Sequence, residues 1–72
     1  MPPSLPILSG KEVIKIFQRL GFHIVRQKGS HILMKRENIA CVVPNHKELK
    51  VGTLRGVLKQ ANVSAEEFLQ DL

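Results

Sequence analysis

The chain has 72 residues, a length that holds one small domain. A domain of this size buries only about 60% of the surface that its unfolded chain exposes, which excludes a nucleotide-binding domain joined to a substrate domain. Eleven lysines and arginines against six acidic residues give a formal net charge of +5. This balance favours a polyanionic partner such as nucleic acid.

Cysteine usage and hydropathy indicate the cellular compartment. The single cysteine, Cys41, has no partner for an internal disulfide, which favours a reducing environment. Its neighbours in IACVV predict a buried thiol rather than a reactive one. The first ten residues lack the basic and apolar regions of a signal peptide, and no segment has the length of a transmembrane helix. We therefore expect a cytoplasmic protein without a membrane partner.

The first predicted helix covers residues 10–20 and follows an irregular arm over residues 1–8 that contains three prolines. The segment SGKE is a capping box, in which Ser9 accepts a hydrogen bond from the amide of Glu12 and the Glu12 carboxylate reaches back to Ser9. Apolar residues then recur at helical spacing. Gly21 ends the helix because glycine enters the left-handed conformation without a steric penalty.

The next stretch predicts an antiparallel meander of three short strands. Each segment is rich in strand-forming residues, and a short turn separates it from the next. The predicted strands cover residues 22–27, 30–36 and 39–44, with turns at Lys28-Gly29 and Glu37-Asn38.

Two more helices are predicted after a polar loop over residues 45–50. The first starts near Val51 and ends at Asn62, a residue that tolerates the left-handed conformation. The second opens with another capping box, SAEE. The order α-β-β-β-α-α, in a single domain over residues 1–72, predicts an α+β fold with a three-stranded antiparallel sheet and the helices on one face.

Several classes of catalytic site are excluded by the side chains present. A zinc site needs three or four ligands at workable spacing, and the candidates His23, His31, His46 and Cys41 are not so spaced. We expect neither a metal nor a small-molecule cofactor. Ser30 adjoins His31, but neighbouring strand residues point to opposite faces, which argues against a Ser-His nucleophile. The chain also has no glycine-rich phosphate loop.

The candidate site that remains is a histidine with cationic side chains near it. If Lys28-Gly29 is a two-residue turn, Arg26 faces His31 across the hairpin. Arg26, Lys28 and Lys35 would then hold a phosphodiester beside the imidazole. An unperturbed histidine titrates near neutral pH and suits proton transfer from a group such as the 2′-hydroxyl of RNA. A structural role at the end of a strand is the alternative reading of this spacing.

The other two histidines allow different interpretations. His46 lies in the loop after the third strand, where it is either a second acid or base, a phosphate donor, or a solvated loop residue. His23 falls on the strand face opposite Arg26 and is most simply a surface residue.

Three segments resemble the HicA (YcfA-like) family of toxin ribonucleases. They are KGSH after the first helix and strand, VVPNH after the third strand, and GTLRGVLKQANVSAEEF over the last two helices. The likeness covers residues 9–69. It implies a fold like that of the double-stranded RNA-binding domain, cleavage of messenger RNA, and a HicB-type antitoxin as protein partner. It also implies that the histidine of the Gly-Ser-His motif, here His31, is catalytic.

We therefore predict the toxin of a type II toxin-antitoxin system, an endoribonuclease that cleaves mRNA without a metal ion and uses His31 as general acid or base. The predicted RNA-binding residues surround it: Arg26, Lys28, Gly29, Ser30, Lys35 and His46. The chain departs from the resemblance at Met34, where the family often has an aromatic residue. Because the chain also lacks Tyr and Trp, few side chains are available for base stacking.

Two other functions fit the same residues. The domain is a non-catalytic RNA-binding module if His31 only hydrogen-bonds RNA. It is a small adaptor if one face of the sheet docks a partner protein.

The alternation of strand residues leaves open which face of the sheet is buried. Val25, Ile32 and Met34 fall opposite Leu33 and form an exposed apolar patch for a partner if no helix covers them. If their face is the core instead, the open residues are Phe22, Ile24 and Leu33.

Overall fold

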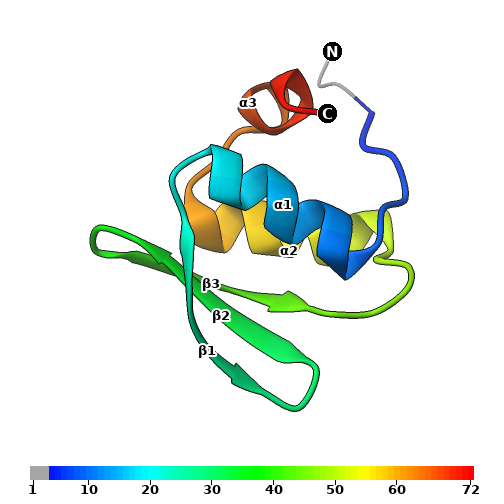
Figure 1. Cartoon of the computed structure of the whole chain (residues 1–72). Coiled ribbons are helices and arrows are strands. Elements are labelled where there is room, and N and C mark those ends of the chain that lie inside the picture. Colours follow the sequence, from blue (N-terminus) through cyan, green and yellow to red (C-terminus); the bar gives the residue numbers. More distant parts are fainter. Residues whose placement is uncertain (1–3) are drawn as a thin grey trace.

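The computed structural model describes residues 4–72, which form a sheet and a layer of helices (Figure 1). Of the prolines in the N-terminal arm, Pro2 and Pro3 lie outside the described residues. The elements in chain order are α1 (Gly10–Arg19), β1 (His23–Lys28), β2 (His31–Arg36), β3 (Ile39–Pro44), α2 (Val51–Ala61) and α3 (Ala65–Gln70). The predicted α+β class and element order are confirmed.

The sheet is antiparallel with the strand order β1-β2-β3, and the helices lie on one side of it (Figure 1). Alternate residues of β2 and β3 point toward the helices and are buried: Ile32, Met34, Cys41 and Val43. Their neighbours point the other way and form a surface that we call the open face: His31, Leu33, Lys35, Ala40 and Val42. The core therefore lies between one face of the sheet and the helices.

The two predicted capping boxes differ in outcome. At α1 the box is complete: Ser9 Oγ accepts from the Glu12 amide at 3.1 Å, and Glu12 Oε1 accepts from the Ser9 amide at 2.9 Å. The hydrogen bonds from Ser9 lower the pKa of Glu12. At α3, Ser64 Oγ accepts from the Glu67 amide at 3.0 Å, but the Glu67 carboxylate turns toward Arg36 instead of back to the cap. The second box is therefore only half formed.

The segment before α1 packs against the loop that follows β3. The Leu49 amide donates to the Leu8 carbonyl at 2.7 Å, and the Gly10 amide donates to the His46 carbonyl at 2.8 Å. Leu5, Leu8 and Leu49 are buried in the core. The loop that the sequence predicts as polar thus contributes one core side chain, because pairing with the N-terminal segment turns Leu49 inward.

The first hairpin differs in register from the prediction. Its two-residue turn is Gly29-Ser30, so Lys28 rather than Arg26 lies opposite His31, and Arg26 lies opposite Leu33. Gly29 has a φ of +58°, which suits the first central position of a type II′ turn. The difference moves each partner by two residues, and this leaves Arg26 on the same face as His31 because side chains alternate with a period of two.

A β-bulge at Val25 interrupts the alternation along β1. Ile24 lies opposite Met34, and His23 lies opposite Lys35. Because the bulge inserts one extra residue, Ile24 falls on the helix side of the sheet and His23 falls on the open face. The predicted faces of Ile24 and His23 are therefore wrong, since strict alternation does not hold across a bulge.

The structure decides between the two faces of the sheet that the sequence left open, and it excludes the patch of Val25, Ile32 and Met34. Ile32 and Met34 belong to the core beneath the helices, so they do not form an exposed surface with Val25. The alternative holds in part: Leu33 lies on the open face, whereas Phe22 is buried. Phe22 packs against an aromatic ring of α1, with ring centroids 5.1 Å apart.

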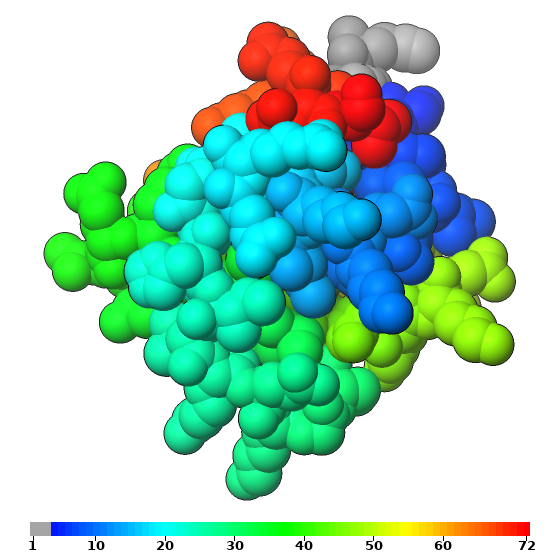
Figure 2. Space-filling view, viewed as in Figure 1, coloured from blue at the N-terminus to red at the C-terminus, as the bar shows by residue number. Residues whose placement is uncertain are grey.

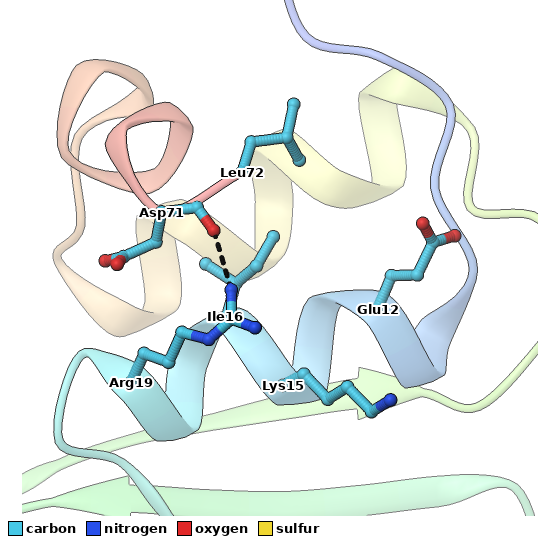
Figure 3. Close-up of a pocket in the computed structure, with 6 residues that line it drawn as sticks. All are labelled: Glu12, Lys15, Ile16, Arg19, Asp71 and Leu72. Atoms are coloured by element: carbon cyan, nitrogen blue, oxygen red, sulfur yellow. Dashed lines mark hydrogen bonds between the residues drawn. The ribbon is translucent and has the colours of Figure 1, made fainter.

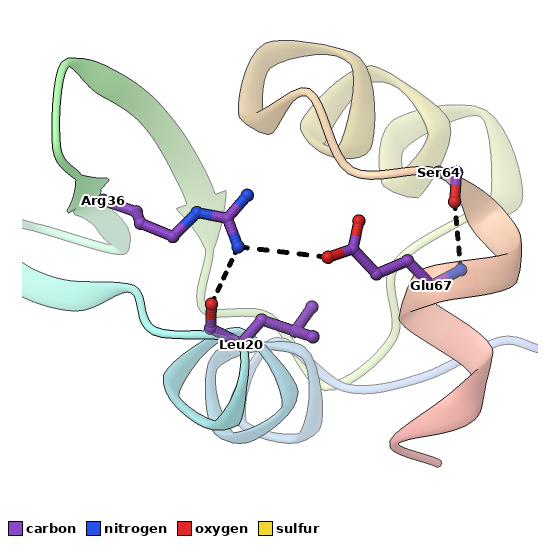
Figure 4. A network of polar contacts seen from close by, with 4 residues as sticks. All are labelled: Leu20, Arg36, Ser64 and Glu67. Atoms are coloured by element: carbon purple, nitrogen blue, oxygen red, sulfur yellow. Dashed lines mark hydrogen bonds and ion pairs between the residues drawn. The ribbon is translucent and has the colours of Figure 1, made fainter.

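Arg36, the last residue of β2, connects the sheet to two helical segments (Figure 4). Its Nη1 donates to the Leu20 carbonyl at 2.8 Å and lies 4.0 Å from a carboxylate oxygen of Glu67. The guanidinium also lies over the ring of Phe22, 4.6 Å from its centroid. Arg36 thus holds the far end of the β2–β3 hairpin, away from the Gly29-Ser30 turn.

Candidate functional site

Close to the Gly29-Ser30 turn, the open face contains a shallow hollow of about 250 Å³. All three strands contribute to it, and its lining residues are Arg26, Lys28, His31, Leu33 and Val42. The side chains of Arg26, Lys28 and His31 are exposed. A large, extended ligand can therefore reach all three without any rearrangement of the fold.

The hairpin turn fixes the position of the imidazole relative to the cations. Lys28 and His31 are directly opposite each other, which places their Cβ atoms about 5 Å apart. Arg26 is the diagonal neighbour of His31, and the long Arg26 side chain can reach the imidazole. Gln27 Nε2 donates to the Gly29 carbonyl at 3.0 Å, and the Asn45 amide donates to the Ser30 carbonyl at 2.6 Å.

The electrostatic character of the site follows from the charged side chains of the three strands. None of the three strands contains Asp or Glu, so the hollow has cations and no carboxylate among its lining residues. An anion placed beside His31 meets Arg26 and Lys28 without competition from an acidic side chain. The arrangement can bind a phosphate group and exchange a proton with it or with an adjoining hydroxyl.

Four predicted site residues do not line this hollow: Gly29 and Ser30 form the turn beside it, and Lys35 and His46 lie farther away. Lys35 is on the open face, but it is four residues along β2 from His31, about 13 Å away for an extended strand. His46 lines a separate hollow with Ser9, Lys11, Asn45 and Lys47. The structure therefore brings together Arg26, Lys28 and His31, with the Gly29-Ser30 turn beside them.

Sequence reasoning missed three contributors to the site, although it placed one of them, Leu33, on the face that carries His31. Val42 lines the hollow opposite Leu33, and the correctly predicted Glu37-Asn38 turn already implies that pairing. Asn45 holds the Ser30 carbonyl from the loop after β3. No pattern in the loop sequence indicates that second contact, because it depends on how the loop folds back.

Other features of the described residues bear on the class of site. Among residues 4–72, no group of three or more His, Cys, Asp or Glu side chains could hold a metal ion. Within the same range, no helix is long and apolar enough to cross a membrane. Cys41 is buried, and burial raises the pKa of its thiol to about 11. The prediction of an unreactive cysteine agrees with that environment.

A third hollow lies between α1 and the C-terminal residues (Figure 3). Two of its charged side chains make structural hydrogen bonds: Arg19 Nη1 donates to the Asp71 backbone carbonyl at 2.9 Å, and Glu12 caps the helix. These bonds account for Arg19 and Glu12, and we assign no chemistry to this hollow.

Comparison with known proteins identifies the protein family of the chain. A protein-family model described as HicA toxin of bacterial toxin-antitoxin matches residues 10–63, a span that runs from α1 to the segment between α2 and α3. No curated protein matches the chain. The matched span contains every residue of the hollow around His31 and more than half of the sequence. The chain therefore belongs to the HicA toxin family of bacterial toxin-antitoxin systems.

Proposed function

We propose that this toxin is an endoribonuclease that cleaves mRNA without a metal ion, with His31 as the catalytic general acid or base. The observation that carries the proposal is the position of His31, whose exposed imidazole lies opposite Lys28 and diagonal to Arg26 in a hollow without acidic lining residues. RNA is a polyanion that carries both the phosphate for the cations and the 2′-hydroxyl for the imidazole.

The proposed reaction is an internal transesterification. His31 takes the proton of a 2′-hydroxyl while that oxygen forms a bond to the adjacent phosphorus. The bond from phosphorus to the 5′-oxygen of the next nucleotide breaks, and the departing oxygen takes a proton from water. The products are a 2′,3′-cyclic phosphate and a 5′-hydroxyl end, and the imidazolium returns its proton to solvent.

The cations act on the charge that develops at phosphorus. Arg26 and Lys28 hold the non-bridging oxygens and stabilise the transition state electrostatically. Gly29 and Ser30 shape the turn beside these cations. Lys35 and His46 contact phosphates farther along the RNA. Leu33 and Val42 provide an apolar floor for a ribose or base.

A protein partner is part of the proposal. A toxin with an open, shallow site needs restraint, and we propose a HicB-type antitoxin that prevents RNA from reaching His31. The net charge of +5 favours an acidic partner, since opposite charges accelerate encounter.

The experiment uses purified chain and a labelled single-stranded RNA in excess EDTA. We expect cleavage to continue, because the proposed groups are an imidazole and two cations. A matched RNA with a 2′-deoxy nucleotide at the mapped cleavage position should remain intact at that position, since the nucleophile is absent. The 5′-hydroxyl product ends can be detected by labelling with a polynucleotide kinase.

Two results would overturn the mechanism. One is loss of cleavage in EDTA with recovery on added magnesium. The other is unchanged cleavage of the 2′-deoxy RNA. Binding of RNA without any cleavage would instead support a non-catalytic RNA-binding module.

A further inference from the structure

The two edges of the sheet differ in how they are covered. On β3, the Val42 amide donates to Gln60 Oε1 of α2 at 3.0 Å. On β1, all six residues are exposed, and Figure 2 shows its teal atoms at the surface with no helix in front of them. Alternate residues of such an edge strand direct their N–H and C=O groups away from the sheet, where another strand can pair with them.

The side chains of β1 differ on its two sides. On the open face it presents the cations Arg26 and Lys28. On the helix side it presents Ile24, which is 46% exposed although its partner Met34 is fully buried. Val25, at the bulge, is 47% exposed. An additional strand at this edge would meet positive charge on one face and, at Ile24, apolar surface on the other, where Gln27 lies opposite Ile32.

The charge of β1 determines which strand fits. A second copy of the chain would place the cations of one β1 against those of the other, and like charges directly opposite each other are destabilising. A strand with carboxylates on the open face would instead form opposite-charge pairs with Arg26 and Lys28. No acidic residue in the three strands of this chain already fills that role.

We propose that the free edge of β1 binds an extended segment of a partner protein in which acidic and apolar residues alternate. The partner strand adds to the sheet by main-chain hydrogen bonds. Its acidic side chains lie beside Arg26 and Lys28 on the open face, and its apolar side chains cover Ile24 on the helix side. Strand addition of this kind draws affinity from the backbone and specificity from alternate side chains.

The bound strand also regulates the site, a consequence that rests on the proposed function. Arg26 and Lys28 line the hollow around His31. Carboxylates paired with these cations compete with RNA phosphates for the same charges. Binding at β1 therefore inhibits RNA binding even where the strand does not touch His31.

The test uses the whole chain and a short, blocked peptide in which Glu and Val alternate. A matched peptide carries Gln in place of each Glu. Hydrogen exchange, followed residue by residue by NMR, reports which backbone amides become protected. We expect the acidic peptide to slow exchange along β1 and to bind about five- to tenfold more tightly than the Gln peptide, the effect of two cross-strand charge pairs. Added salt should weaken the binding of the acidic peptide more than that of the Gln peptide.

Two variants place the same new charge on opposite edges of the sheet. Val25→Asp adds a carboxylate beside the proposed docking edge, and the half-exposed side chain allows the chain to remain folded. Ala40→Asp adds one at an exposed position of β3. We expect Val25→Asp to lower the affinity of the acidic peptide about fivefold, because its carboxylate repels the peptide at β1. We expect Ala40→Asp to leave that affinity unchanged, because only β1 receives the strand.

The proposal is overturned if neither peptide protects β1, if protection appears at β3 or the helices, or if the Gln peptide binds equally well. It is also overturned if single-stranded RNA, and not the acidic peptide, protects the β1 amides. Because hydrogen exchange requires no RNA cleavage, these outcomes do not depend on the catalytic assignment. The peptide can bind at β1 even if the chain does not cleave RNA, and the chain can cleave RNA even if the peptide does not bind.

Discussion

At Gly10 the first turn of α1 touches the chain that follows β3. A Cβ atom at this position would lie 2.7 Å from the Cα of Asn45 and would also contact the carbonyl oxygen of Pro44. Both are backbone atoms and cannot rotate away. The sequence predicts a helix start here, but it does not show that only glycine permits the close approach.

We therefore expect Gly10→Ala to lower the free energy of unfolding by about 1–3 kcal/mol, the usual cost of overpacking. Gly56→Ala is the matched control, because Gly56 lies within α2 and a Cβ there meets no atom within 4 Å. That substitution should raise stability by about 0.5–1 kcal/mol, since alanine favours helix. Urea unfolding of both variants measures the difference, and equal stabilities would contradict the packing at Gly10.

Cys41 gives the fold a dependence on alkaline pH. The side chain is 1% exposed, and burial raises the pKa of its thiol from 9.0 to about 11. The unfolded chain therefore loses this proton at a lower pH than the folded chain does. The stability that the neutral thiol contributes is fully present below pH 9.0 and is lost as pH rises through about 11.

We expect the stability of the wild-type chain to fall between these pH values more steeply than that of Cys41→Ala. The variant keeps every other titrating group, so the difference between the two urea-unfolding curves isolates the thiol. A difference that stays constant with pH would show that the thiol titrates alike in both states.

At the scale of elements, helix ends and the Glu37-Asn38 turn could be predicted because their signals are local. The complete capping box at Ser9 and the left-handed Asn62 are examples. The register of the first hairpin could not be predicted in this way. Turns at Lys28-Gly29 and at Gly29-Ser30 satisfy the same alternation of strand residues, since they differ by two in pairing. The bulge at Val25 has no local signal either.

Arg36 is the element-scale contact whose removal should matter most. It donates to the Leu20 carbonyl and covers the Phe22 ring, so Arg36→Ala should cost about 1–3 kcal/mol of unfolding free energy. Glu67→Gln removes only the partly exposed ion pair at 4.0 Å and should cost less than about 1 kcal/mol. Thermal or urea unfolding compares them. A larger loss for Glu67→Gln would assign the anchoring to the ion pair.

For the whole molecule, the net charge of +5 predicts salt-sensitive RNA binding, but charge alone does not locate the surface. The open face and α2 both carry cations, on opposite sides of the sheet. Folding separates them, and the hollow around His31 distinguishes one from the other. The site itself was predictable in part: Arg26, Lys28 and His31 meet, whereas Lys35 and His46 lie apart because strand length and loop path set their positions.

We expect Lys28→Ala to reduce the slope of log affinity against log salt by about 0.7 for a single-stranded RNA made uncleavable by 2′-O-methyl groups. Lys59→Ala removes a comparable exposed charge from α2 and should leave the slope unchanged. Fluorescence anisotropy at several salt concentrations measures both. Equal effects of the two substitutions would indicate diffuse binding over the whole basic surface.

In the proposed reaction, His31 performs the proton transfer. The most direct measurement compares single-turnover RNA cleavage in EDTA by His31→Ala and His23→Ala, with thermal melts to show that both variants fold. His23 is the matched control, because it is also an exposed strand histidine of the open face. We predict that His31→Ala loses at least about a hundredfold in rate and that His23→Ala keeps the wild-type rate. Wild-type cleavage by a folded His31→Ala variant would contradict the assignment.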